Sequence, residues 1–184
     1  ARNGNYSTIH PVHTIHERPE LIEKWVRIGD WEGDTICGAK NKSCLVTQVD
    51  RVSKLVTAAI SPNHTKEAVR AATKRAFELL PVDLPIHSIT LDNGSEFADF
   101  KNIEKDLNTT IYFADPHSPW QRGLNENTND IIRFFFPKGT LKNPDLLTLY
   151  NPLKQVLFRK KNSVVFSISS RFFLLNISLI SKKN

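Results

Sequence analysis

The sequence contains no methionine, only two cysteines and no long apolar segment. Because its 184 residues begin with alanine and lack methionine, we interpret them as a fragment, or as a reading frame without its true start. No signal-peptide pattern opens the chain, and no apolar run reaches the roughly 18 residues that predict a membrane span. The sequence therefore indicates no membrane partner, and its length is that of one domain with a tail.

The few cysteines and histidines give little sign of a disulfide or a zinc site. Cys37 and Cys44 flank a short polar segment that can turn a hairpin. A reduced pair of small side chains is the expected state in a chain without a secretion signal. His10, His13 and His16 resemble metal ligands only loosely, since no cysteine lies near them, and we predict no zinc site there.

A basic excess is missing from the larger part of the chain. The whole chain carries a net charge of +6, but nine Lys and Arg against one acid give the segment from Pro137 onward a charge of +8. Residues 1–136 hold 16 basic and 18 acidic residues, a net charge of −2. The high isoelectric point therefore does not by itself indicate that the main domain binds phosphates.

The apolar periodicity predicts an α/β domain at residues 21–140, between an arm at 1–20 and a basic, apolar tail at 141–184. Strands are expected at Thr35–Cys37, Ser43–Asp50, Lys54–Ile60, Ile86–Leu91 and Thr110–Phe113. Helices are expected at Pro19–Arg27, Thr65–Leu80, Phe97–Leu107 and from Trp120 onward. Short links between the first three strands favour an antiparallel meander, and the helices between later strands favour a mixed five-stranded sheet flanked by helices.

Three acidic residues are expected to meet at one edge of this sheet. Asp34 opens the first strand, Asp92 follows the fourth, and Glu126 lies on the late helix. Grouped carboxylates repel one another unless a cation intervenes, and Mg²⁺ prefers carboxylate and water oxygens. Two such ions about 4 Å apart can activate an attacking oxygen and stabilise a leaving one in phosphoryl transfer.

Each acidic residue taken alone also has a structural interpretation. Asp34 could bond to its local backbone, and Asp92-Asn93-Gly94 is an ordinary turn sequence. Glu126 could belong to a solvated helix face. The spacing of the residues leaves these alternatives open.

Three motifs resemble one family of DNA-processing enzymes. WEGD at 31–34, LDNGSEF at 91–97 and YFADPHSPWQRGLNENTN at 112–129 are similar to the catalytic core of the IS-thirty family of insertion-sequence transposases. The similarity runs from about Ile15 to Thr140, and the 33 residues between Asp92 and Glu126 suit the Asp-Asp-Glu pattern of such enzymes. The resemblance implies a retroviral-integrase-type catalytic core at residues 21–140 with a ribonuclease-H-like fold.

The resemblance also implies roles for individual residues. Asp34, Asp92 and Glu126 are expected to be catalytic and to bind two Mg²⁺ or Mn²⁺ ions. Supporting residues or DNA contacts are expected at Trp31, Asn93, Gly94, Glu96, Trp120, Arg122, Gly123, Asn125 and Asn127. We expect Arg122 to contact a phosphate or orient a carboxylate, and Trp120 to be a packing anchor in preference to a platform for base stacking.

The implied activity is transposition. A DNA phosphodiester is hydrolysed at the element end, and the freed 3′-hydroxyl then attacks target DNA. The expected partners are element-end DNA, target DNA and further copies of the chain in a synaptic complex. The expected location is the cytoplasm, on the nucleoid.

Two departures from the family keep other hypotheses open. No helix-turn-helix segment is found, and residues 141–184 carry no family motif, which we interpret as a frameshift in a decayed gene copy or, alternatively, as a genuine extension. The alternative to an active core is a catalytically dead transposase remnant with at most nonspecific DNA binding. A ribonuclease-H-type nuclease acting on a hybrid is the third hypothesis, and the segment SPWQRGLNEN argues against it.

Overall fold

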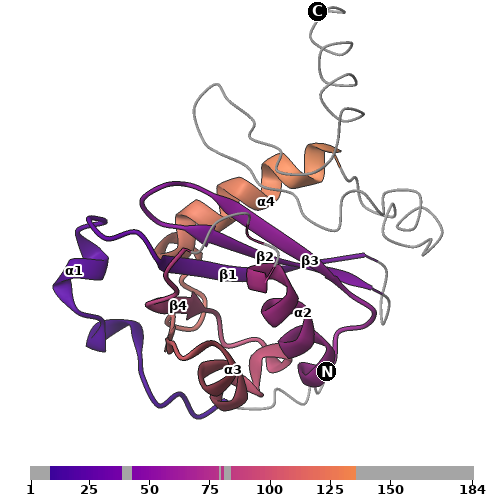
Figure 1. Cartoon of the computed structure of the whole chain (residues 1–184), viewed down its shortest axis with the longest axis horizontal. Coiled ribbons are helices and arrows are strands. Elements are labelled where there is room, and N and C mark those ends of the chain that lie inside the picture. Colours follow the sequence, from indigo (N-terminus) through magenta and orange to yellow (C-terminus); the bar gives the residue numbers. More distant parts are fainter. Residues whose placement is uncertain (1–8, 39–42, 79, 81–83, 136–184) are drawn as a thin grey trace, which may run out of the picture.

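A five-stranded sheet forms the centre of the computed structural model, which describes residues 9–38, 43–78, 80 and 84–135 (Figure 1). Its strands are β1 (Asp30–Cys37), β2 (Cys44–Asp50), β3 (Val56–Ser61), β4 (Ser88–Leu91) and β5 (Thr110–Phe113). They lie in the order β3-β2-β1-β4-β5, in which β1, β2 and β3 form an antiparallel meander and β4 and β5 run parallel to β1. The predicted meander and the predicted mixed sheet are both confirmed, whereas the predicted tail at 141–184 lies outside the described residues.

Helices cover both faces of this sheet. The described helices are α1 (Glu20–Glu23), α2 (Lys66–Glu78), α3 (Phe100–Leu107) and α4 (Gly123–Phe135), with 3₁₀ turns η1 (Ile15–Glu17), η2 (Ser95–Phe97) and η3 (Pro119–Arg122). Figure 1 shows α2 and α3 on one face of the sheet and α4 across the other, where it contacts β1 and β2. None of the described helices is long and apolar enough to cross a membrane.

α2 forms where the sequence predicts it. Thr65 accepts the backbone N–H of Ala68 with its Oγ1 and so caps the first turn. Val69, Ala72 and Ala76 then follow at helical spacing and are fully buried against the sheet. This apolar stripe fixes α2 on the face that carries the hydrophobic core.

Trp31 lies at the centre of that core. Its side chain is 0% exposed, its Nε1 donates a hydrogen bond to the main-chain oxygen of Pro85 at 3.1 Å, and its ring meets Phe77 edge to face at 5.1 Å. Ile89 of β4 and Phe113 of β5 continue the same cluster beneath α2 and α3. The face of the sheet that packs on α2 and α3 is therefore closed by apolar side chains.

β1 is longer than predicted, because it begins at Asp30 and not at Thr35. Asp34 is therefore in the middle of the strand, and the expectation that it opens the strand is wrong. The first half of β1 pairs with β2 on one side and with β4 on the other. These distant partners outweigh the low strand propensity of Asp, Glu and Gly in this segment.

The pairing of β1 with β2 brings the two cysteines together. Cys37 and Cys44 are direct register partners across the antiparallel pair, which confirms the predicted hairpin. Both are free cysteines, with Cys44 buried and Cys37 partly buried.

The helix predicted at Pro19–Arg27 is wrong in length, since α1 ends at Glu23. Trp25 has a φ of 55°, a left-handed conformation in which a helix cannot continue. The Arg51 guanidinium lies 4.6 Å and the Lys54 ammonium 3.6 Å from the centroid of the Trp25 ring. These cation–π contacts with the segment between β2 and β3 compete with helix propensity and hold the tryptophan out of the helix.

Candidate active site

Asp34 lies on the face of β1 that α4 covers. Asn129 of α4 donates a hydrogen bond from Nδ2 to Oδ2 of Asp34 at 2.8 Å, and Oδ1 accepts the backbone N–H of Thr35 at 2.7 Å. Thr47, the register partner of Asp34 on β2, donates to the Oδ1 of Asn129 at 3.2 Å. The local backbone bond considered from the sequence is therefore present, together with contacts from two other elements.

Asp92 directly follows β4, as predicted, and is linked to Asp34 by Arg122. The Nη2 of Arg122 donates to Oδ2 of Asp92 at 3.1 Å, and its Nη1 lies 3.7 Å from Oδ2 of Asp34. Nη1 also donates to the main-chain oxygen of Gly33 at 3.1 Å. Oδ1 of Asp92 accepts the N–H of Gly94 at 3.1 Å, so the turn and the carboxylate pair exist together.

The electrostatics of this pair favour added positive charge. Burial raises the pKa of Asp34 from 3.8 to about 6; the charges of Asp92 and Glu96 also raise it, whereas Arg122 lowers it. Two ionised carboxylates close together in a partly buried site repel each other. At neutral pH the ionised pair is therefore costly, and a cation near it is stabilised.

Glu126, the third predicted acid, does not join the pair. Its side chain is exposed, about 100° around α4 from the buried Asn125. Among the described residues, no group of three or more His, Cys, Asp or Glu side chains is placed to hold a metal ion. An amide can donate to Asp34, as Asn129 does, whereas a third carboxylate would repel it. The role of Glu126 stays a prediction.

Asn125 holds α4 on the sheet through a second acid of β1. Its backbone N–H donates to Oε2 of Glu32 at 3.1 Å. Its Oδ1 lies 3.4 Å from the hydroxyl oxygen of Thr47, whose single proton is shared between Asn125 and the closer Asn129. The side chain is fully buried, so Asn125 positions α4 and is not on the surface of the described chain.

Two further motif residues support the loops around the pair. Asn93 donates from Nδ2 to the main-chain oxygen of Ala114 at 2.6 Å, which ties the end of β4 to the end of β5. Glu96 accepts the hydroxyl of Thr35 at 3.0 Å and pairs with Nε2 of His64 at 3.2 Å. The side chains of Asn93 and Glu96 therefore help to fix the positions of β1, β4 and β5 around the carboxylate pair.

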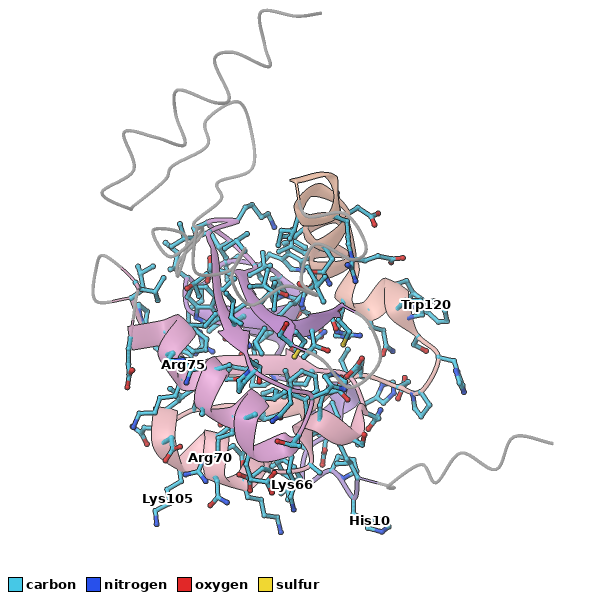
Figure 2. The ribbon with its side chains drawn as sticks, turned by 90° about the vertical axis from the view of Figure 1, so that its right-hand side faces the viewer. His10, Lys66, Arg70, Arg75, Lys105 and Trp120 are labelled. Carbon is cyan, nitrogen blue, oxygen red and sulfur yellow. The ribbon has the colours of Figure 1, made fainter. Side chains whose placement is uncertain are left out.

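The two tryptophans of the motifs have opposite environments. Trp31 packs in the core on the face of β1 opposite Asp34, which leaves it no access to DNA in this fold. Trp120 is 72% exposed, and Figure 2 shows it projecting from the surface, away from Arg70 and Arg75 on α2. The expectation that Trp120 is a packing anchor is therefore wrong, since it lies in η3 and not on the apolar stripe of α4. Asn127 is also exposed.

Sequence reasoning missed several buried polar residues. Glu32 and Arg51 form an ion pair at 3.3 Å whose side chains are 1% and 3% exposed. Burial raises the pKa of Glu32, and Arg51 opposes this shift. Glu32 stands inside WEGD and Asn129 ends the last motif, so the motifs contained a signal for both. No motif pointed to Thr47, because only the pairing register of β2 with β1 places it beside Asp34.

Comparison with known proteins decides the family. A family model described as "Integrase core domain" matches residues 27–119, just over half of the chain. The chain belongs to the integrase core domain family. The matched segment includes β1 with Asp34 and the turn with Asp92, and it lies within the predicted domain at 21–140, whose limits stay a prediction.

Curated relatives of this integrase core are transposases. The transposase for insertion sequence element IS4351 of Bacteroides fragilis is 43% identical over 125 residues, which cover 68% of this chain and 38% of that protein. Transposase InsI for insertion sequence element IS30A of Escherichia coli (strain K12) is 40% identical over 141 residues, 76% of this chain and 36% of that protein. The resemblance to IS-thirty transposases is thereby confirmed, and the chain spans little more than a third of the length of these relatives.

A solved structure supports the fold of this integrase core. It is the cryo-electron microscopy structure of the simian T-cell lymphotropic virus intasome in complex with PP2A regulatory subunit B56 gamma. The TM-score is 0.53 at 22% sequence identity, and the match covers 76% of this chain and 51% of that chain. At this identity the likeness concerns the fold, and it agrees with the ribonuclease-H-like architecture expected from the motifs.

Proposed function

We propose that this chain carries the catalytic centre of a DNA transposase. The centre hydrolyses a phosphodiester at the end of a mobile element and joins the freed 3′-hydroxyl to target DNA. One observation carries the proposal: Asp34 and Asp92, far apart in sequence, are brought to one guanidinium by neighbouring strands of an integrase core. The identity with transposases points to the same reaction.

The carboxylate pair suits hard divalent cations, Mg²⁺ or Mn²⁺. Its donors are oxygens, the pKa of Asp34 is raised by burial and by Asp92, and Arg122 already takes a position between the two acids. Asp34 and Asp92 would hold the metal, with Glu126 as the third ligand that the motif implies, and two ions is the number we propose. When bound, such ions lower the barrier by activating the attacking oxygen and stabilising the leaving one.

The protein's own side chains position this chemistry. Asn129 and the N–H of Thr35 fix the orientation of the Asp34 carboxylate. Arg122 balances the charge of the pair and, beside bound cations, is available to a DNA phosphate. The backbone N–H of Gly94 donates to Oδ1 of Asp92 and so fixes this carboxylate in the turn after β4.

The partners we propose are element-end DNA and target DNA, acted on by more than one copy of the chain in the cytoplasm. Residues 1–136 carry a net charge of −2, and Arg70 on α2 is paired with Asp99 and Asp106. Metal-bound carboxylates and Arg122 are therefore expected to contribute more to productive DNA contact than general surface charge does.

The test is metal-dependent nicking and strand transfer by the purified chain on DNA that carries element ends, in Mg²⁺ or Mn²⁺. Asp92→Asn keeps the size of the side chain and removes its charge. We expect it to lose activity by about a hundredfold or more, because mutating residues that only support a metal ligand already costs about 10–100-fold. Asp130→Asn is the matched control, because Asp130 is an exposed acid on the same chain.

Equal activity of Asp92→Asn and the unchanged chain would contradict the proposal. A folded chain that has no activity with either metal would favour the dead remnant. Circular dichroism melts of all three proteins separate loss of chemistry from loss of fold.

A further inference from the structure

A cavity of about 590 Å³ opens beside the carboxylate pair and has no part in the mechanism above. Its walls come from the segment around η1 and α1, from β1, from the residue that follows β2, and from η3 with the start of α4. Trp25 and Trp120 line it, together with Gly123 at the start of α4. The buried side chains of Arg18, Arg51 and Glu32 complete the lining. The volume is that of a site for a small molecule or for one unit of a polymer.

The two tryptophans of the cavity wall keep much of their surface accessible. Trp120 is 72% exposed and Trp25 is 40% exposed (Figure 2 labels Trp120). An indole left this open offers a flat apolar face on which a planar ligand can stack. Trp25 is also held in a left-handed conformation by contact with Arg51, so its orientation is set by the fold.

Two guanidinium groups lie behind the aromatic walls. The side chains of Arg18 and Arg51 are each 3% exposed. Arg18 donates to Thr90 Oγ1 at 3.0 Å and pairs with Glu23. Nη1 of Arg51 is paired with Glu32, whereas Nε of Arg51 has no hydrogen-bond partner among the described residues. A buried guanidinium donor without an acceptor is unusual, because leaving it unpaired costs free energy.

Glu32 gives the cavity an acceptor next to these donors. Its Oε1 lies 3.3 Å from Nη1 of Arg51. The edge of a nucleobase presents donors and acceptors side by side, and its faces stack on indoles. Aromatic walls, buried guanidinium groups and a neighbouring carboxylate together match a nucleotide better than they match an apolar ligand.

The position of the cavity connects it to the carboxylate pair. Glu32 and Asp34 are two residues apart on β1 and point to the same face, about 7 Å from each other along the strand. Arg122, which contacts both acids, stands in the sequence between the cavity residues Gln121 and Gly123. The cavity and the carboxylate pair are therefore neighbouring sites on the side of β1 that faces α4.

We propose that this cavity receives one unpaired nucleotide of the DNA strand, adjacent to the phosphate at the carboxylate pair. The base stacks on Trp120, and Arg51 with Glu32 meets its polar edge. A base in a duplex has both faces covered by its neighbours, so the nucleotide must be unpaired or turned out of the helix to enter. The inference deepens the proposed function and rests on it, because it takes DNA as the substrate.

The experiment measures binding without catalysis. The probe is a fluorescein-labelled DNA hairpin with one unpaired nucleotide at its 3′ end, compared with the same hairpin whose unpaired nucleotide is abasic. Both hairpins carry the same number of phosphates, so the difference between them reports the base alone. Affinities are measured by anisotropy at low salt in EDTA with the full chain.

We expect the base-bearing hairpin to bind about tenfold more tightly than the abasic one, as base–indole stacking generally gives. Trp120→Ala should abolish this ratio, and Trp120→Phe should keep most of it. Val12→Ala, which removes an exposed apolar side chain outside the cavity, should leave it unchanged. A ratio near one for the unchanged chain, or the full ratio in Trp120→Ala, would overturn the proposal.

The same assay separates this inference from the proposed function. It is repeated with Asp92→Asn, which should keep the tenfold ratio while losing nicking. A base-dependent ratio without any nicking activity would remove the transposase proposal and leave the nucleotide site. Nicking activity without a base-dependent ratio would remove the nucleotide site alone.

Discussion

The two faces of the central sheet differ in the side chains that β1 contributes to them. On the face beneath α2 and α3, Trp31 and Ile89 belong to a continuous apolar cluster. On the face beneath α4, the residues that alternate with Trp31 along β1 are Glu32 and Asp34. Both faces are well buried, but the second combines buried apolar side chains, such as Val49 and Ile132, with buried hydrogen bonds and ion pairs.

This difference indicates that the face beneath α2 and α3 supplies most of the stability, whereas the face beneath α4 carries the groups for the proposed chemistry. Apolar burial stabilises the face beneath α2 and α3 without directional requirements. Buried carboxylates and guanidinium groups beneath α4 contribute little net stability. Removing one partner of such a pair leaves an uncompensated buried charge, which destabilises the fold. Substitutions on the two faces should therefore differ in size and in their dependence on pH.

The largest effect is expected from truncating the buried tryptophan. Trp31→Ala should lower the free energy of unfolding by about 3–5 kcal/mol, because it leaves a cavity in the core and removes the hydrogen bond to Pro85. Trp120→Ala removes the same side chain from an exposed site and should change stability by less than about 0.5 kcal/mol. Urea unfolding of both variants measures the difference, and similar losses in the two would contradict the assignment of Trp31 to the core.

The pH dependence of Asp34 should give the next largest effect. The pKa of Asp34 is about 6 in the folded chain and 3.8 in the reference state, so the unfolded chain loses this proton first as pH rises. Stability should therefore fall between about pH 4 and pH 6, by up to about 3 kcal/mol, and be fully present only below that window.

Unfolding in EDTA across this range, with and without Asp34→Asn, checks the prediction. The difference between the two stability curves should show the Asp34 contribution, since the asparagine does not titrate. Asp130→Asn serves as the control and should retain the full pH dependence. Parallel curves for Asp34→Asn and the unchanged chain would rule out the raised pKa.

The smallest effect is expected from two glycines near Arg122. Arg122 donates a hydrogen bond to the main-chain oxygen of Gly33, and Gly123 follows Arg122 in the sequence. A Cβ on Gly33 would lie 2.6 Å from Cδ2 of Leu91 and 2.7 Å from Oε1 of Gln48, both buried, so Gly33→Ala should cost about 1–3 kcal/mol. Gly123 has nothing within 4 Å of such a Cβ, and Gly123→Ala should instead stabilise by about 0.4–1 kcal/mol. Thermal melts of the two variants should shift in opposite directions, and equal shifts would refute the close strand packing at Gly33.

The apolar face was the more predictable of the two from sequence. Helical spacing revealed α2, and β-propensity revealed most of β2 and β3, because these patterns are local. The start of β1 was missed, since its acidic and glycine residues become a strand only through pairing with β2 and β4. Arg122 and Asp92 were named from motifs, whereas the inward face of α4, with Asn129 on Asp34, depends on how the helix is rotated against the sheet.

The order of the strands also sets an order of events in folding. β1, β2 and β3 pair with near neighbours in sequence, but β4 reaches β1 only after the chain has passed through β2, β3 and α2. Contacts between distant segments carry a larger loop-closure cost and form later. We therefore expect the two acids to be brought together only after the hairpins and α2 have formed. The repulsion between the two acids then opposes only the late contact between β1 and β4, and not the earlier formation of the hairpins and α2.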